Sequence, residues 1–150
     1  MTSPYQRYQG FWPHKMDPKF RVAIPASWRQ ELGSTLHVMC SRQYDMPVIR
    51  VLTQEAYDLK VDLVLNSDKT PAEKERILGK LANLSRPCVV NDQGKLLVPK
   101  EFSLVAGLSA DGEAIMVGRG NFFQIWNRQN FTQMFDIESQ PEAEDDLGIF

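Results

Sequence analysis

The sequence predicts an α+β fold that is mainly β, and three observations support this class. Residues 16–25 fall on residues 90–99 when the chain is shifted by 74 positions, with Asp on Asn, Arg on Lys and Pro on Pro. Each copy joins a turn sequence to a short apolar run, which indicates paired strands. In each copy a proline then opens an amphipathic segment that ends at a glycine, which indicates a helix. We therefore expect two β-β-α-β repeats with additional flanking helices.

The repeats define the expected domain organisation. A chain of 150 residues with 43% hydrophobic residues is large enough to bury one core. We expect one domain over residues 1–136, in which repeat 1 covers about 8–84 and repeat 2 about 86–136. Residues 137–150 lack a hydrophobic period and are rich in acidic side chains, so they are expected to form an acidic flexible tail.

Charge is distributed unevenly along the chain, although the net charge is only −2. Residues 1–33 carry five cationic side chains against two acidic ones, whereas residues 129–150 carry six acidic side chains and no Lys or Arg. The folded part is therefore more basic than the total suggests, which matters because phosphate neutralisation supplies most non-specific DNA affinity. No apolar run of about 18 residues and no apolar signal core occur, so we expect a soluble cytoplasmic protein.

The cysteines and histidines give no sign of a metal site. Cys40 and Cys88 are too few for a disulfide framework and are expected to be buried small hydrophobes. His37 and Cys40 could suggest a metal-binding pair, but a separation of three residues on a strand directs the side chains to opposite faces. We therefore expect no metal and no other cofactor.

Two turn sequences carry the repeat. Asp17-Pro18-Lys19-Phe20 predicts a type I turn, because Asp at the first position can accept from the backbone ahead and Pro at the second presets φ. Asn91-Asp92-Gln93-Gly94 predicts the same turn, with glycine where a bulged hairpin takes a left-handed residue. Short apolar strands follow at 22–24 and 96–98, so each turn is expected to close a hairpin.

The strands follow from similar signals. The first strand, 11–16, contains Pro13 and is expected at a sheet edge, because proline cannot donate to the strand ladder. Two further hairpins are expected, one of 36–40 and 47–52 across a longer loop at 41–46, and one of 114–118 and 122–126 across a tight turn at 119–121.

The helices are marked by their ends. Proline and glycine delimit helices at 25–32 and 99–106, whose expected core-facing residues are Trp28, Leu32, Phe102 and Ala106. Thr53, Thr70 and Asn127 predict the N-caps of three more helices, and Thr70 opens a capping box. The helix after Thr70 has an apolar stripe that is expected to be buried between the repeats, formed by Ile77, Leu78, Leu81 and Leu84.

Residues of both halves also occur in the order and spacing of a known family. The first half has Gly10, His14, Asp17, Lys19, Arg21, Pro25, Ala26 and Arg29, and the second half has Gly94, Pro99, Ala106-Gly107-Leu108, Val117-Gly118 and Ile125-Trp126. Over residues 8–135 the chain resembles the MraZ family, which is related to the AbrB and SpoVT regulators. The resemblance implies a double-split, swapped-hairpin β-barrel in which both units lie on one chain.

The resemblance also implies a function. MraZ proteins are DNA-binding transcriptional regulators, so the chain is expected to bind short direct repeats near its own promoter, upstream of the division and cell-wall gene cluster. It is expected to be cytoplasmic and nucleoid-associated, and to assemble into a ring of identical subunits, an octamer or larger. Double-stranded DNA and further copies of the chain are therefore the implied partners, with no membrane and no small-molecule substrate.

The candidate DNA-binding residues surround the two turns. Carried over by position, the family's DNA-contacting arginine is Arg21, and its counterpart in the second motif is Lys95. A two-stranded ribbon fits the major groove, so cations at the tip of such a ribbon would reach DNA. The expected DNA-binding residues are Arg21, Lys19, Lys95, Lys15 and Arg29, and the expected turn-forming residues are Asp17, Pro18, Asn91 and Gly94.

Several positions depart from the family pattern. Phe20 stands where the family has glycine before the first arginine, and a bulky residue in a left-handed conformation costs about 1–2 kcal/mol. Asn91 and Lys95 replace the usual Asp and Arg of the second motif, which keeps the cation but loses the guanidinium fork that suits guanine. Gln9 stands at a position that is usually basic.

Other classes of function are less well supported. His14 and His37 have no neighbouring nucleophile in a recognisable elbow, and no phosphate-binding glycine loop occurs, so an enzyme is not expected. The cations could instead be ordinary solvated charges on an exposed turn. The main alternative is a divergent oligomeric scaffold that has lost operator recognition, motivated by Phe20, Asn91 and the acidic tail. An AbrB-type antitoxin would use one unit per chain, which the internal duplication argues against.

Overall fold

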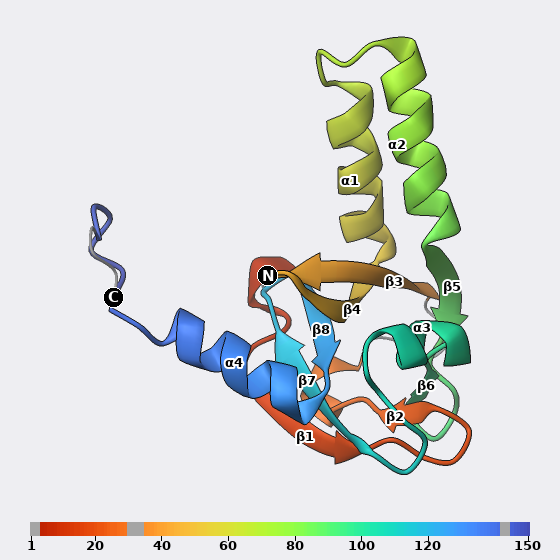
Figure 1. The fold of residues 1–150 in the computed structure, drawn as a ribbon, viewed down its shortest axis with the longest axis vertical. Helices are drawn as coiled ribbons and strands as arrows, with labels where there is room; N and C mark the ends of the chain where they lie inside the picture. Colours follow the sequence, from red (N-terminus) through yellow and green to blue (C-terminus); the bar gives the residue numbers. More distant parts are fainter. Residues whose placement is uncertain (1–3, 30–34, 142–144) are drawn as a thin grey trace.

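The computed structural model describes residues 4–29, 35–141 and 145–150, and Figure 1 shows their arrangement. The strands are β1 (Phe11–Lys15), β2 (Arg21–Ala23), β3 (Thr35–Gln43), β4 (Met46–Thr53), β5 (Ser85–Val89), β6 (Lys95–Leu97), β7 (Glu113–Gly118) and β8 (Phe122–Trp126). The helices are α1 (Gln54–Leu65), α2 (Pro71–Asn83), α3 (Lys100–Val105) and α4 (Arg128–Glu138), with short 3-10 helices η1 (Pro4–Gln6) and η2 (Ala26–Trp28).

The strands form two antiparallel sheets, so the fold is α+β and mainly β, as predicted. The larger sheet has the order β1-β7-β8-β4-β3-β5, and the smaller one consists of β2 and β6. The outer strands of the larger sheet cross between the halves of the chain, because β1 pairs with β7 and β5 pairs with β3. The described strands do not pair around a closed barrel. β1 lies at a sheet edge, where Pro13 predicts it.

The register of two strand pairs reveals an approximate two-fold axis. In the smaller sheet Val22 faces Leu96, and between β4 and β8 Arg50 faces Gln124. The members of both pairs are 74 positions apart, which is the offset of the sequence repeat. An antiparallel pairing that is centred on equivalent residues relates its two strands by a two-fold rotation. The two halves therefore meet through equivalent strands.

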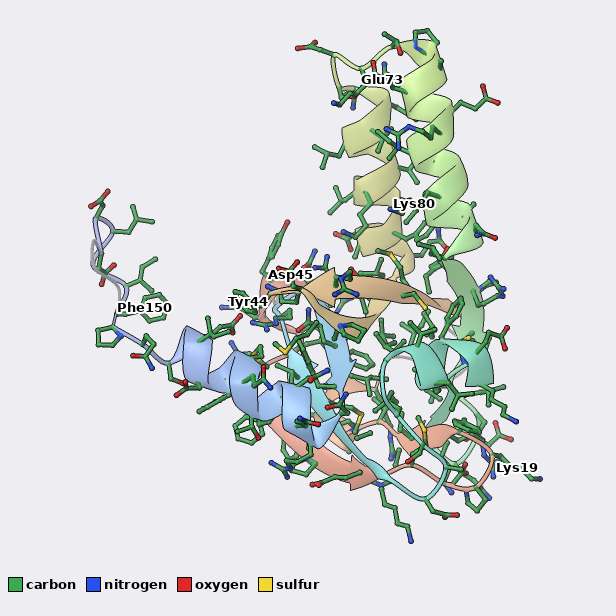
Figure 2. The ribbon with its side chains drawn as sticks, in the orientation of Figure 1. Lys19, Tyr44, Asp45, Glu73, Lys80 and Phe150 are labelled. Atoms are coloured by element: carbon green, nitrogen blue, oxygen red, sulfur yellow. The ribbon has the colours of Figure 1, made fainter. Side chains whose placement is uncertain are left out.

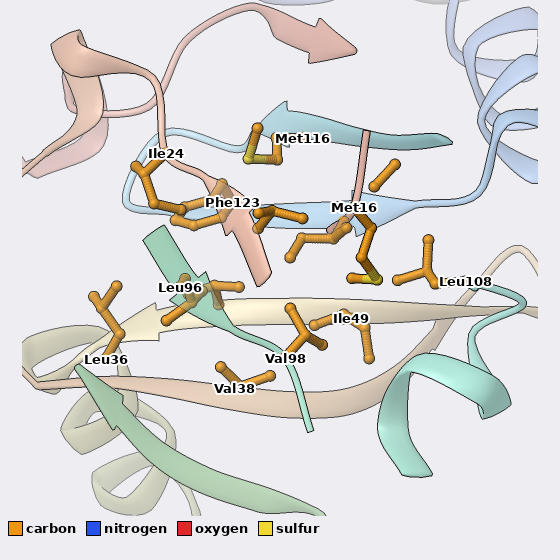
Figure 3. Packing of buried hydrophobic residues seen from close by; sticks show 14 of the residues in the cluster. Met16, Ile24, Leu36, Val38, Ile49, Leu96, Val98, Leu108, Met116 and Phe123 are labelled. Carbon is orange, nitrogen blue, oxygen red and sulfur yellow. The ribbon is translucent and has the colours of Figure 1, made fainter. Parts of the chain in front are cut away.

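One hydrophobic core is built from both halves of the chain. Figure 3 shows side chains of the two sheets filling a common interior, among them Met16 from the first half and Leu96 from the second. Both of these side chains are completely buried. Tyr8 adds an aromatic cluster, with its ring centroid 5.5 Å from Trp28 and 5.3 Å from Phe123. Because each half supplies part of the core, we expect neither half to fold without the other.

The starts of α1, α2 and α4 and the end of α3 agree with the predictions. Thr53, Thr70 and Asn127 each accept a hydrogen bond from the backbone N–H three residues ahead, and Thr70 completes a capping box. Helix α3 is followed by Gly107, whose φ of 72° is the left-handed value that favours glycine. The predicted core-facing residues Trp28, Phe102 and Ala106 are buried, while Leu32 lies outside the described residues.

Helices α1 and α2 form a helical hairpin that projects away from the sheets (Figure 1). Helix α2 contains no fully buried residue, and its predicted apolar stripe is only half-buried. The prediction that this stripe is buried between the repeats is therefore wrong, because its main partner is α1, which is itself largely exposed. None of the helices in the described residues is long and apolar enough to cross a membrane.

Two further predictions need correction. The helix expected at 25–32 is a single 3-10 turn that ends at Trp28, because Arg29 has an extended backbone with φ −68° and ψ 128°; residues 30–34 lie outside the described part. The loop expected at 41–46 is a two-residue turn between β3 and β4, because Tyr44 and Asp45 have φ values of 52° and 61°. Such values match a turn that continues the twist of its flanking strands.

Cys40 and Cys88 are free thiols that pack against the core but are only partly buried, so they are less buried than predicted. Cys88 lies on β5, an edge strand, and Cys40 lies on the neighbouring strand β3. A side chain near an open sheet edge has fewer neighbours to cover it. Burial of the remaining part raises the pKa of both thiols.

Candidate nucleic-acid interface

The first turn is closed by Asp17. The Phe20 N–H donates to the Asp17 carbonyl oxygen at 3.0 Å, which makes the four-residue turn. The Asp17 carboxylate oxygen Oδ1 accepts from the backbone N–H groups of Lys19 at 2.9 Å and Arg21 at 2.8 Å. Pro18 is exposed at the second position, and Phe20 has a φ of 62°. This is a turn followed by a left-handed residue, the geometry that a glycine would usually supply.

The second turn repeats this hydrogen-bond scheme. The Gly94 N–H donates to the Asn91 carbonyl oxygen at 2.9 Å, and Asn91 Oδ1 accepts from the N–H groups of Gln93 and Lys95, both at 2.9 Å. Gly94 has a φ of 75°, equivalent to the 62° of Phe20. Asp and Asn can replace each other here because only one side-chain oxygen is needed as the acceptor.

The strands on either side of each turn separate, so the two predicted hairpins are not formed. β1 pairs with β7, and β2 pairs with β6, rather than with each other. One more backbone hydrogen bond flanks the first turn: the Asp17 N–H donates to the Arg21 carbonyl oxygen at 2.9 Å. In the second turn the Asn91 N–H donates to the Lys95 carbonyl oxygen, also at 2.9 Å. The turn residues fix a local chain reversal, whereas the flanking strands β1 and β2 pair with strands of the other half.

The two turns lie against each other around the two-fold axis. The Ile24 N–H donates to the Gly94 carbonyl oxygen at 2.9 Å, and the equivalent Val98 N–H donates to the Phe20 carbonyl oxygen at 2.9 Å. These bonds extend the short β2–β6 ladder at both ends. Residues that are far apart in sequence therefore form one surface.

Asp17 links the two principal candidate residues. Its Oδ2 atom lies 2.7 Å from Arg21 Nε and 4.0 Å from Lys95 Nζ. The side chains of Arg21 and Lys95 are 32% and 33% exposed, and that of Asp17 is 18% exposed. One carboxylate from the first turn therefore contacts a cation from each half of the chain, which the sequence did not indicate.

The hydrogen bonds around Asp17 favour its ionised form. Burial acts to raise the pKa of Asp17, but hydrogen bonds from the Arg21 backbone, the Arg21 side chain and the Lys19 backbone outweigh it and lower the pKa below its usual value. Asp17 is therefore ionised at neutral pH. It offsets part of the positive charge of Arg21 and Lys95 and restricts where the two side chains can point.

The other candidate cations differ in their surroundings. Lys19 is exposed at the tip of the first turn (Figure 2). Arg29 donates from Nε to the Ile24 carbonyl oxygen at 3.0 Å, and its guanidinium lies over Gly94, where an added Cβ would be 2.4 Å from Arg29 Cζ. Lys15 lies at the end of β1 and lines a shallow pocket together with Asp111 and Glu113, so acidic groups partly offset its charge. Arg21, Lys95, Lys19 and Arg29 thus belong to one surface, and Lys15 lies at its margin.

Trp12 is a residue of this surface that the sequence analysis missed. It is 44% exposed and lines a pocket of about 460 Å³ together with His14, Ala23 and Arg29. Its ring centroid is 6.4 Å from that of buried Trp28 in an edge-to-face contact. A tryptophan next to Pro13 on a predicted edge strand is a signal that could have identified it, because such a position leaves one face of the ring uncovered.

Comparison with known proteins identifies the family. The chain is 30% identical to a protein named transcriptional regulator MraZ from Shewanella denitrificans, over 155 aligned positions that cover 95% of this chain and 98% of that protein. The chain belongs to the MraZ family. A protein of the same name from Ruegeria pomeroyi is 28% identical, and the alignment covers 85% of this chain and 81% of that protein. Another, from Yersinia pestis, is 26% identical, and the alignment covers 94% of each chain.

No protein-family model matches the chain. Among solved structures, the chain is similar to the solution structure of PHS018 from Pyrococcus horikoshii, with a TM-score of 0.33 and 12% identity over 79% of this chain and 87% of that one. The left-handed φ of Phe20 shows that the first turn has the backbone geometry of the second, in which Gly94 occupies the equivalent position.

Proposed function

We propose that this MraZ-family protein is a sequence-specific DNA-binding transcriptional regulator that uses the paired turns as its contact surface. The observation that supports this most strongly is the junction at Asp17, which holds Arg21 and Lys95 side by side although 74 residues separate them. Its operator would consist of short direct repeats near its own promoter, in the division and cell-wall gene cluster. It would act in the cytoplasm, associated with the nucleoid.

The two halves of the surface would contribute unequally to DNA binding. Arg21 can contact guanine through two N–H groups at once, whereas Lys95 offers a single ammonium that suits a phosphate. The contact with Asp17 uses the Arg21 Nε atom, which leaves the two terminal nitrogens of the guanidinium for DNA. Asp17 would thus hold Arg21 in position before binding, which reduces the entropy lost on contact. Lys19 and Arg29 would contact phosphates on either side.

Assembly is part of the proposed mechanism. The few cations of one chain would bind DNA weakly, because each phosphate contact adds only a modest, salt-dependent increment. A ring of identical subunits would present the same surface many times, and linked sites gain affinity through effective concentration. Evenly spaced direct repeats are an operator that such a ring could occupy through several subunits. The strand exchange and two-fold axis within each chain would form one swapped-hairpin unit of this ring.

The decisive experiment compares Arg21→Ala and Lys95→Ala in a gel-shift titration with the DNA upstream of the protein's own gene. We expect Arg21→Ala to weaken binding about 10–100-fold and to relax base preference, as for loss of a bidentate base contact. Lys95→Ala should weaken binding less, equally for all sequences, and should reduce the salt dependence by about one phosphate. Oligomer mass, measured by light scattering, should stay unchanged in both variants.

Arg76→Ala is the matched control, because it removes an exposed cation from α2, far along the projecting arm. Its binding should equal that of the unmutated protein. If the unmutated protein fails to bind its own upstream DNA at low salt, the regulator proposal is wrong. The oligomeric scaffold that has lost operator recognition would then be the better explanation.

A further inference from the structure

The segment after α4 presents a compact apolar group to solvent. Leu147, Ile149 and Phe150 are 82%, 66% and 96% exposed. Asp145 holds this segment in a turn, because its carboxylate accepts from the backbone N–H groups of Ile149 at 3.0 Å and Phe150 at 2.8 Å, and its carbonyl accepts from Gly148 at 3.1 Å. Three large apolar side chains are thus held outward within four residues. Such a preorganised group is suited to insertion into a groove.

An apolar groove lies elsewhere on the molecule, at the base of the projecting arm. It has a volume of about 540 Å³. Strand β3, the start of β4, the end of α2 and the end of α3 form it, through Met39, Cys40, Ser41, Arg42, Pro47, Lys80, Leu81, Leu84 and Val105. Val105 is 65% exposed although it is fully apolar. A groove lined mainly by such partly exposed apolar side chains is suited to an apolar occupant.

The groove and the C-terminal segment have complementary charges. Arg42 and Lys80 are the charged residues of the groove lining, and none of its described residues is acidic. Asp145 and Asp146 directly precede the apolar group of the segment. An occupant with this order of side chains would bury its apolar group while its carboxylates approach the two cations. This charge match favours the segment over a purely apolar or a basic occupant.

The segment and the groove lie on different sides of the same molecule. In Figure 1, α4 extends away from the body on the side opposite α3 and β5, and Figure 2 shows Phe150 far from Lys80. The end of α4 is fixed in this direction, because Glu138 contacts the Arg119 Nη1 atom at 2.7 Å and the Tyr44 hydroxyl at 2.7 Å. The groove of a neighbouring copy is therefore a more accessible site than the chain's own groove.

We propose that residues 145–150 of one copy dock into the groove between α2, β3 and α3 of the next copy. This contact is head-to-tail: each chain offers one segment and one groove, so successive contacts close into a ring or continue as a filament. The inference rests on the self-association in the proposed function and names the surfaces that produce it. The DNA-contacting turns are not part of either surface.

Cys40 provides a test of this contact, because it is a natural thiol in the groove lining. In a Cys88→Ser background, Phe150→Cys gives each chain one thiol in the groove and one in the docking segment. A short bis-maleimide should then link successive copies and give a ladder of dimers, trimers and larger species on a denaturing gel. With Cys40→Ser added as the control, the ladder should disappear, because each chain then has only one thiol.

A second variant tests the contact without chemical cross-linking. Leu147→Asp with Phe150→Asp changes only exposed side chains, so it should not affect folding, and it should lower the mass measured by light scattering to that of the single chain. The docking proposal is wrong if the bis-maleimide links the two thiols within one chain and gives no ladder. It is also wrong if no ladder forms and the Leu147→Asp, Phe150→Asp variant keeps the mass of the unmutated protein. Gel shifts on the same samples separate the two proposals: assemblies that bind operator DNA without a ladder contradict only the docking, whereas a ladder without DNA binding contradicts only the regulator.

Discussion

The turn at residues 17–21 and the turn at residues 91–95 share one hydrogen-bond scheme but differ in the side chains that surround it. The acceptor is Asp17 in the first and Asn91 in the second, and the left-handed residue is Phe20 in the first and Gly94 in the second. The backbone geometry of these turns therefore requires neither aspartate as the acceptor nor glycine at the left-handed position. What differs is how each half fills the space beside its turn.

The neighbours of Phe20 and Gly94 explain how a bulky residue is accommodated. The space above Gly94 is filled by the guanidinium of Arg29, which also donates to the Ile24 carbonyl oxygen. The residue equivalent to Arg29 in the other half is Ser103, a buried small side chain whose Oγ donates to the Val98 carbonyl oxygen at 3.3 Å. From the equivalence of the two halves we infer that the small Ser103 side chain leaves room for Phe20, whose partly buried ring packs against the core. Burial of this ring offsets the cost of about 1–2 kcal/mol for its left-handed backbone.

The largest expected effect comes from converting the second turn to the composition of the first. Gly94→Phe places a bulky residue at a φ of 75° and displaces the Arg29 guanidinium, so we expect a loss of about 2 kcal/mol in the free energy of unfolding. Adding Arg29→Ser recreates the combination of Phe20 and Ser103 and should recover about 1 kcal/mol of that loss. Urea denaturation followed by circular dichroism measures both changes.

Gly79→Phe is the matched control for this substitution. Gly79 lies in α2 with an ordinary φ and no atom within 4 Å of an added Cβ, so the same change should not destabilise the protein. If Gly94→Phe is as harmless as Gly79→Phe, the left-handed position carries no cost in this protein. If Arg29→Ser gives no recovery, Arg29 is not what limits the space above Gly94.

The reverse substitution should have a smaller effect. Phe20→Gly relieves the left-handed strain but removes a partly buried ring and adds chain entropy to the unfolded state. These terms oppose each other, so we expect the free energy of unfolding to change by about 1 kcal/mol or less. A stabilisation much larger than this, in the same urea assay, would show that Phe20 is strained without compensation.

Local features of this fold could be predicted from the sequence because their partners are a few residues away. The N-caps at Thr53, Thr70 and Asn127 and the two Asx-closed turns depend on contacts between residues two to four positions apart. Contacts at this short sequence separation are enough to specify a chain reversal or the start of a helix. The turn at Tyr44 and Asp45 was missed because neither residue is a glycine or asparagine, the usual signal for left-handed positions.

The strand partners and the composition of the candidate surface could not be predicted in the same way. A turn sequence specifies that the chain reverses, but the partner of β1 is decided by which hydrophobic face is available, and that face belongs to β7 in the other half. The contact of Asp17 with Lys95 depends on the two-fold arrangement. Arg29 was selected as a DNA-contacting cation, but its contacts with Ile24 and Gly94 also give it a structural role.

The smallest expected change in stability comes from giving the first turn the uncharged acceptor of the second. Asp17→Asn keeps the acceptor of the turn, as Asn91 does in the second half, but removes the carboxylate that contacts Arg21 and Lys95. We expect a loss of about 0.5 kcal/mol in the free energy of unfolding at pH 7, typical of a partly exposed ion pair. The same change removes an opposing charge from Arg21 and Lys95 but also the contact that holds Arg21 before binding. We therefore expect DNA affinity at low salt to rise less than the change in charge alone predicts.

The pH dependence of this small difference identifies its origin. The folded-state pKa of Asp17 is lowered, so its contribution to stability is present above the unfolded value of about 3.9 and is lost as the pH falls through the folded value. The unmutated protein and Asp17→Asn should therefore converge in stability as the pH falls below the lowered folded-state pKa of Asp17. Asp92→Asn removes the same charge from an exposed position of the second turn and should show no such convergence. A difference that persists at low pH would mean that Asp17 acts through turn geometry, and that Asn is not its equivalent in the first half.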